Sequence, residues 1–326
     1  MMPAALPRPH LEPAPAICIV VPTFRRPATL AALLAALASQ TAGRSGIEIL
    51  VVDNDPAGSA HDLVVAYASR SPLRTHYACI AEPGLSVVRN VGLAFARHRF
   101  DCVAMIDDDE IPAPDWLEQL LRVHDSSGAA AVIGPVPSRL PGDAPAWIRG
   151  GAFFDLPMFA DGADVADGYT GNCLIDLRAS AARDLCFDPR MNLAGGEDQL
   201  FFRELLARGG RIAFAAQAVA TEIVAPARLT AGYLLRRSFR RGNTMWMCDR
   251  HIHGRSVGML ARRVAFGAGR ISVGLALLPP RAVRYGTAGI VRSLCDVARG
   301  SGTLAGALGI TYLAYRRRAG RGSESS

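Results

Sequence analysis

The sequence predicts an α/β protein built on a parallel sheet, followed by a basic region of different character. In the first two thirds of the chain, short apolar runs rich in β-branched residues alternate with helical patterns, which is typical of a parallel sheet covered by helices. The chain has 326 residues, 50% hydrophobic and 20% charged, so it can bury a large core and is not of a disordered type. Its 32 glycines and 21 prolines are too few for a collagen-like or low-complexity protein.

The first expected elements follow one another as strand, helix, strand and helix. They are a strand over Ile17–Val21, a helix that begins at Pro27, a strand over Ile47–Val52 and a helix near Ala60–Ala68. Pro27 suits the first position of a helix because its fixed backbone angle is already helical. The leucines behind it recur at helical spacing and share one face: Leu30, Leu33, Leu34 and Leu37.

The alternation continues through the middle of the chain. A turn at Glu82–Leu85 precedes a helix that Ser86 is expected to cap. The remaining expected elements are a strand over Cys102–Ile106, a helix from about Pro114 to His124, a strand over Ala129–Ile133, a strand over Asn172–Leu177 and a helix over Glu197–Arg208. Residues 135–167 are rich in glycine, proline and aromatic residues and are expected to form a long, functional loop region.

Charge divides the chain into two parts. Residues 1–227 hold 18 arginines against 26 acidic residues, a net charge of −8, whereas residues 228–326 hold 18 arginines against 3 acidic residues, a net charge of +15. The basic part would favour a polyanionic partner, which is either an anionic membrane face or a nucleic acid. Because the basic part has no recognisable nucleic-acid module, a nucleic-acid partner is not expected. Its longest uncharged run, Gly300–Tyr315, is shorter than a spanning helix needs, so an interfacial helical pair is favoured.

These patterns predict that the chain has three regions and that the protein is located in the cytoplasm. The regions are a flexible lead-in over 1–16, an α/β domain over 17–230 and a basic amphipathic helical region over 231–326 that associates with a membrane. The seven cysteines show neither CxxC spacing nor a zinc pattern, which indicates reduced thiols in the cytoplasm. The proline-rich start does not have the pattern of a secretory signal.

Two groups of acidic residues follow predicted strands. Asp53 ends a strand, where it can accept hydrogen bonds from a base or a ribose, or act as an ordinary turn residue. Asp107-Asp108-Asp109-Glu110 follows an apolar strand, and four adjacent acids repel one another unless something positive lies beside them. Asp107 and Asp109 can share a hard divalent cation with a diphosphate, whereas the alternative is a surface acidic turn.

Two further motifs lie at predicted helix starts. In Gly195-Gly196-Glu197-Asp198 the acids suit either a general base on a rigid element or the helix dipole alone. Arg89, on the helix behind Glu82–Leu85, suits a phosphate, a brace for the acidic cluster or a solvated helix face.

Five blocks of sequence, taken in order, resemble the family 2 glycosyltransferases of the GT-A fold. They are Val20–Arg26, Val51–Asn54, Glu82–Ser86 with Arg89-Asn90, Ile106–Glu110 with Pro112 and Trp116-Leu117, and Gly195–Asp198. The likeness covers about residues 16–245 and is strongest to bacterial members that build exopolysaccharides such as succinoglycan. It implies a mixed, mostly parallel sheet flanked by helices.

The resemblance implies inverting transfer from a nucleotide-diphosphate sugar, with UDP expected, to a hydroxyl of a saccharide or lipid-linked saccharide. It implies the following roles: donor binding by Pro22, Thr23, Arg25, Asp53, Arg89, Asp107 and Asp108; Mg²⁺ or Mn²⁺ binding by Asp107 and Asp109; base catalysis by Asp198, with Glu197 orienting the acceptor; and an acceptor-side wall at Gly171, Asn172 and Gly196. The QxxRW motif of processive synthases is not evident, which favours single additions.

The resemblance also implies a place and leaves alternatives. Lipid-linked acceptors are used at the inner face of the plasma membrane, where the basic region would hold a cytoplasmic, peripheral enzyme. A sugar nucleotidyltransferase is an alternative, but Pro22–Arg26 is not the glycine-rich phosphate loop it would need. A non-catalytic assembly partner is a second alternative, against which the retained acids argue. A dehydrogenase is disfavoured because no GxGxxG follows the first strand.

Overall fold

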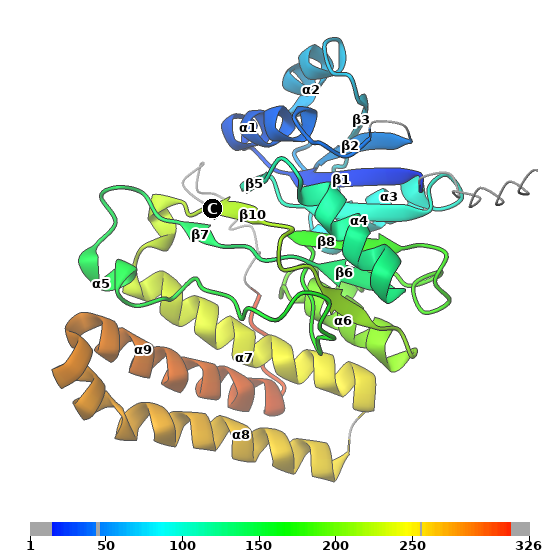
Figure 1. The fold of residues 1–326 in the computed structure, drawn as a ribbon. Helices are drawn as coiled ribbons and strands as arrows, with labels where there is room; N and C mark the ends of the chain where they lie inside the picture. The colour runs from blue at the N-terminus through cyan, green and yellow to red at the C-terminus, as the bar shows by residue number, and fades with distance from the viewer. Residues whose placement is uncertain (1–14, 44–45, 255, 314–326) are drawn as a thin grey trace, which may run out of the picture.

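The computed structural model describes residues 15–43, 46–254 and 256–313, and these residues form a seven-stranded sheet at the centre of the molecule (Figure 1). The strand order is β3-β2-β1-β4-β8-β6-β9. The strands are β1 Ile17–Thr23, β2 Ile47–Asp53, β3 Arg74–Cys79, β4 Cys102–Ile106, β6 Ala131–Ile133, β8 Asn172–Asp176 and β9 Ile212–Phe214. Strand β8 runs antiparallel to both of its neighbours and the other pairings are parallel, so the expected mixed, mostly parallel sheet is confirmed.

Helices cover both faces of this sheet. The alternation of side chains along the strands separates two cores, one with α1, α2 and α4 and one with α3 and α6. The helices are α1 Pro27–Ala38, α2 His61–Ala68, α3 Leu85–Ala96, α4 Trp116–Ser127 and α6 Glu197–Ala207. The leucine face expected for α1 is confirmed, because all four leucines are buried against the sheet.

A small second sheet and short helices follow the carboxyl ends of the main strands. The described residues place β5 Glu110–Pro112, β10 Ala220–Ile223 and β7 Ser138–Arg139 in a three-stranded sheet of order β5-β10-β7. Residues 135–167, expected to be a loop region, contain only β7 and the short helix α5 Ala146–Arg149. Two 3₁₀ turns, Pro189–Met191 and Pro226–Arg228, flank α6 and the second sheet.

The described residues of the basic region form three long helices on one side of the molecule (Figure 1). They are α7 Ala231–His253, α8 Val257–Ala276 and α9 Leu278–Ala307, and α9 lies against both α7 and α8. Helix α9 includes a non-helical residue, Gly286, with a φ of 53°. Across the described part of the chain, none of the helices has the length and apolar character that crossing a membrane requires.

Some local expectations differ from the structure. Ser86 does not cap α3: the cap position is Gly84, and Ser86 lies inside the helix with its hydroxyl donating to the Asp188 carbonyl at 2.9 Å. Strands β3, β9 and β10 were not expected, because none of them is a long apolar run of the kind that predicts a buried strand. Of the lead-in 1–16, residues 1–14 lie outside the described residues.

Candidate active site

The sheet topology brings the ends of three strands together. Strand β1 lies between β2 and β4, and all three run parallel, so their carboxyl ends share one edge. Thr23 lies beside Asp53 in the register of β1 and β2, and Asp107 directly follows β4. Ligands of open α/β sheets bind at this edge, and the chain places its predicted donor-binding residues there.

The acidic run after β4 is held by a hydroxyl and two arginines. Thr23 Oγ1 donates to Asp108 Oδ2 at 2.7 Å. Arg26 Nη1 donates to Asp108 Oδ1 at 3.1 Å and to Asp109 Oδ2 at 2.9 Å. Arg228 Nη2 reaches the same Asp109 oxygen at 3.2 Å. Asp108, at 5% exposure, is not part of a surface turn, and the positive groups that the sequence argument required are arginines of the chain itself.

The titration of these acids shows how crowded the negative charge is. Burial raises the pKa of Asp108 to about 6, and burial together with Asp107 raises the pKa of Asp109. Burial and the neighbouring carboxylates raise the pKa of Glu110 well above its usual range, and Glu110 Oε2 accepts the Asp107 backbone N–H at 3.4 Å. Carboxylate oxygens are the ligands that a hard divalent cation prefers, so the residue types of this run fit the metal that the sequence predicted.

Arg89 connects two of the predicted acidic motifs, the run Asp107–Glu110 and the pair Glu197-Asp198. It lies on α3, is 4% exposed, donates through Nη2 to Asp107 Oδ1 at 3.2 Å and pairs through Nη1 with Glu197 Oε1 on α6. Burial alone would lower the pKa of Arg89, but the carboxylates of Asp107, Glu197 and Asp198 outweigh it and raise the pKa further. Of the three roles considered for Arg89, the structure supports a brace for the acidic cluster. The prediction of a solvated helix face is wrong, because Arg89 is buried.

The start of α6 places Glu197 and Asp198 side by side with different exposure. Gly196 caps the helix with a φ of 84°, and a Cβ there would lie 1.9 Å from Thr244 Cγ2 on α7, so the close approach of the two helices requires glycine. Glu197 is buried, and burial raises its pKa even though Arg89 lowers it. Asp198 is half-buried, and its Oδ1 accepts the Gln199 N–H at 2.7 Å.

The nucleotide-side residues form a second hydrogen-bonded group at the ends of β1 and β2. Asp53 has no exposed surface and accepts hydrogen bonds from the Asp55 N–H (2.9 Å), the Ala60 N–H (2.8 Å) and the Tyr77 hydroxyl (3.0 Å). It therefore orders the turn after β2, and its predicted contact with a base stays a prediction. Arg25, 55% exposed at its side chain, forms a bidentate pair with Asp55 at 3.0 and 3.2 Å, which lowers the pKa of that carboxyl.

The other predicted residues line or support this edge. Pro22 is buried in β1 opposite Val52. A Cβ on Gly171 would lie 2.4 Å from Glu110 Oε1, so Gly171 packs on the acidic run. Asn172 is fully buried: its Oδ1 accepts the Trp116 indole N–H at 2.7 Å, and its Nδ2 donates to two carbonyls. The Asn172 side chain thus braces β8, and the acceptor-side place expected for Gly171, Asn172 and Gly196 stays a prediction.

Sequence reasoning did not assign roles to Arg26, Arg228 and Glu110. Arg26 stands at the end of the first motif block, and the need for a positive group beside the acids was a usable signal for it. Arg228 is 119 residues from its partner Asp109, and nothing in the local sequence connects the two.

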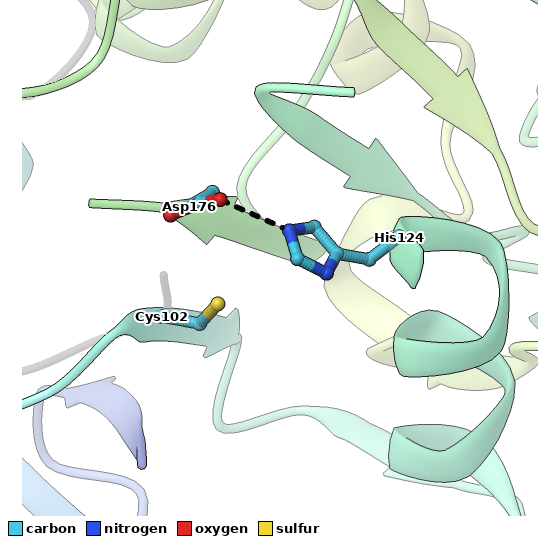
Figure 2. Close-up of side chains that lie close together, drawn as sticks. All are labelled: Cys102, His124 and Asp176. Atoms are coloured by element: carbon cyan, nitrogen blue, oxygen red, sulfur yellow. Dashed lines mark hydrogen bonds and ion pairs between the residues drawn. The ribbon is translucent and has the colours of Figure 1, made fainter. Parts of the chain in front are cut away.

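A second cluster of titratable residues lies at the opposite ends of β4 and β8 (Figure 2). Ligand atoms of Cys102, His124 and Asp176 lie within 4.8 Å of one another, and such residue types can bind a transition metal. Both imidazole nitrogens already meet carboxylates, Asp176 at 3.2 Å and Asp125 at 3.0 Å, and burial raises the pKa of the Cys102 thiol to about 12. The His124 ring is therefore held between two carboxylates, which raise its pKa.

Solved structures share this architecture. The mannosyltransferase PcManGT from Pyrobaculum calidifontis, solved with GDP-Man and Mn²⁺, matches with a TM-score of 0.59 at 19% identity over 89% of this chain and 87% of that one. Residues 1–349 of TarS from S. aureus, solved with UDP-GlcNAc, match with a TM-score of 0.51 at 15% identity over 91% and 93%. The fold is that of the GT-A glycosyltransferases.

Comparison with known sequences identifies the family, whereas the solved structures identify the fold. Residues 18–181 match the glycosyl transferase family 2. The chain is 35% identical to the succinoglycan biosynthesis protein ExoM of Rhizobium meliloti (strain 1021) over 70% of this chain and 73% of that protein. It is 25% identical to the glycosyltransferase AglE of Haloferax volcanii over 72% and 76%. The chain belongs to glycosyl transferase family 2 and is related to glycosyltransferases of exopolysaccharide and cell-surface glycan synthesis.

Proposed function

We propose that the protein is an inverting glycosyltransferase that moves one sugar from a nucleotide-diphosphate donor to a hydroxyl of a saccharide or lipid-linked saccharide. One observation carries this proposal: the buried Arg89 guanidinium pairs with Asp107 on one side and Glu197 on the other. Donor-side and acceptor-side acids from distant parts of the chain therefore meet across a single side chain. The retained and connected acids argue against a non-catalytic partner.

Asp198 is the group that we assign as general base. Inversion needs a single displacement, in which an acceptor hydroxyl attacks the anomeric carbon opposite the departing diphosphate and loses its proton as the new bond forms. Asp198 is the more exposed of the two acids at the start of α6, so an acceptor can reach it. Glu197 is buried and held by Arg89, which suits a residue that orients the acceptor.

The donor lies, in this proposal, along the carboxyl ends of β2, β1 and β4. Arg25, Thr23 and Asp53 form the nucleotide side of the site, and Asp107 and Asp109 would hold Mg²⁺ or Mn²⁺ next to the diphosphate. The cation would supply Lewis-acid stabilisation of the departing diphosphate. UDP is the proposed nucleotide, in line with UDP-GlcNAc in TarS, although PcManGT was solved with GDP-Man.

The relationship to ExoM supports an acceptor in exopolysaccharide assembly. Such acceptors are carried on lipid diphosphates at the inner face of the plasma membrane, and we propose that the protein is cytoplasmic and peripheral there. We further propose that residues 17–230 form the transferase domain and that 231–326 mediate the membrane association. The division coincides with the start of α7.

Two substitutions separate catalysis from donor binding. Asp198→Asn should lower transfer by roughly 10²-fold or more while leaving donor affinity nearly unchanged, because the base acts only on the acceptor. Asp109→Ala should instead abolish the dependence of donor binding on Mn²⁺. A panel of nucleotide sugars, measured by hydrolysis and by calorimetry with and without chelator, provides both readouts. Near-normal turnover of Asp198→Asn would show that Asp198 is not the base. Donor binding by the native protein that does not change with a chelator would show that the donor site needs no metal.

A further inference from the structure

Exposed apolar side chains concentrate on the C-terminal helices. Of the 18 large hydrophobic residues that are exposed among the described residues, 13 lie between 257 and 313. On α8 four of them, together with small alanines, form one stripe at helical spacing. We call this stripe the α8 outer face; it consists of Val257 (84% exposed), Leu260 (41%), Val264 (42%) and Leu275 (58%).

Two of the three arginines of α8 turn inward, whereas Arg262 stays 66% exposed at its side chain. Arg263 is buried and pairs with Asp249 of α7, and Arg270 pairs with Asp296 of α9 at 3.2 Å. A helix at an ordinary aqueous surface turns its charges outward and its apolar residues inward. Helix α8 satisfies its inward cations with buried acids and leaves aliphatic side chains outside, so its sequence is adapted to an apolar neighbour.

The apolar stripe continues around the turn into α9. We call this segment the α8–α9 corner; its exposed members are Leu277 (38%), Val283 (91%) and Tyr285 (49%). Helix α8 and this corner lie at the outer edge of the molecule, away from the main sheet (Figure 1). The stripe and the corner are therefore accessible to a large flat partner.

Charge identifies the partner. The acids among the described residues from 228 to 313 are Asp249 and Asp296, and each pairs with at least two arginines. Arg262, whose side chain is 66% exposed although its Nη2 lies 3.5 Å from Asp249 Oδ2, and the exposed Arg284 add positive charge to the same two helices. A second copy of the chain would bring like charges together across a two-fold interface. An anionic lipid leaflet complements both the cations and the apolar stripe.

We propose that the α8 outer face and the α8–α9 corner insert into the headgroup–acyl boundary of an anionic bilayer, with α8 lying parallel to the membrane surface. This inference specifies the membrane association within the proposed function, but it rests on that function only for its biological purpose. Helix α7 connects the inserted helices to the site, because Thr244 of α7 packs on Gly196 at the start of α6.

Vesicle flotation of the full chain tests the proposal without any transfer reaction. The vesicles contain phosphatidylcholine with or without about one third phosphatidylglycerol. The test variant is Leu260→Glu/Val264→Glu. The matched control is Val65→Glu/Met158→Glu, which changes two residues of similar exposure (53% and 64%) outside the C-terminal helices. Thermal melting of each variant confirms folding.

The native chain and the control should bind the anionic vesicles, and the test variant should bind at least tenfold more weakly while melting normally. Tryptophan placed by Val264→Trp should be quenched by brominated lipid, whereas tryptophan placed by Val65→Trp should not. Equal binding by the test variant, no vesicle binding by the native chain, or a native dimer that Leu260→Glu/Val264→Glu separates would each overturn the proposal. Because these readouts need no donor, a failure here leaves the Asp198→Asn result standing, and the reverse also holds.

Discussion

The ion-paired guanidinium of Arg89 should be a main determinant of both stability and site geometry. Replacing it by methionine keeps most of its volume but removes its charge. Glu197 is then left as a buried carboxylate without its cation, whereas Asp107, with 36% of its side chain exposed, can be solvated. Breaking a buried ion pair by removing one partner costs about 3–5 kcal/mol, and the exposure of Asp107 favours the lower end.

For Arg89→Met we therefore expect a loss of about 3 kcal/mol in the free energy of unfolding at pH 7. At about 2–4 °C per kcal/mol for a larger domain, this corresponds to a fall in Tm of about 6–12 °C. Urea titration followed by tryptophan fluorescence measures the first quantity, and calorimetry measures the second. The matched control is Arg122→Met, which breaks the exposed pair with Asp161 at 2.7 Å and should cost no more than about 1 kcal/mol.

The pH dependence identifies the cause. Burial already raises the pKa of Glu197, and loss of Arg89 should raise it further. An acid whose folded-state pKa is raised costs stability above that pKa, and the cost disappears as pH falls below the unfolded pKa near 4.5. The difference between Arg89→Met and the native protein should therefore shrink from pH 8 toward pH 5. A loss no greater than that of Arg122→Met, or one that does not change with pH, would refute this reasoning.

Two further predictions concern packing and titration. Gly196→Ala should lose about 1–3 kcal/mol of unfolding free energy, because the new Cβ clashes with Thr244 Cγ2. Thr244→Ser removes that methyl group and should restore part of the loss in a double-mutant cycle measured by urea denaturation. Additive effects of the two substitutions would contradict the clash. His124→Gln should cost about 1.5–3 kcal/mol near pH 6, because the hydrogen bonds that the imidazole ring donates to Asp176 and Asp125 raise the His124 pKa. This contribution is complete below about pH 6.5 and is lost as pH rises through the folded-state pKa, so an equal cost at pH 9 would be inconsistent with it.

Local sequence was sufficient where burial and periodicity agree. Strands β1 and β4 are apolar runs buried on both faces, and β2 is such a run apart from Glu48 and the final Asp53. Helix α1 repeats leucine at helical spacing, so each of these elements was predicted within one or two residues. Strand β3 was missed because its polar residues at the sheet edge carry no such signal, and β9 because three residues are too few to show a period. The helix cap at Gly84 was missed because Ser86, two residues later, carries a hydroxyl of the kind that usually caps a helix.

The sequence alone determined the α/β class, the order of the acidic motifs and the basic character of the last third, because these depend on residue type and spacing along the chain. Tertiary structure decided which charged groups meet and what they contact: Arg89 joins Asp107 to Glu197, Arg228 reaches Asp109, and Asp53 accepts hydrogen bonds from the turn after β2. It also decided that Arg263 and Arg270 of α8 turn inward to Asp249 and Asp296, whereas Arg262 stays exposed. Pairing between residues up to 119 positions apart depends on strand order and helix packing, which no local pattern specifies.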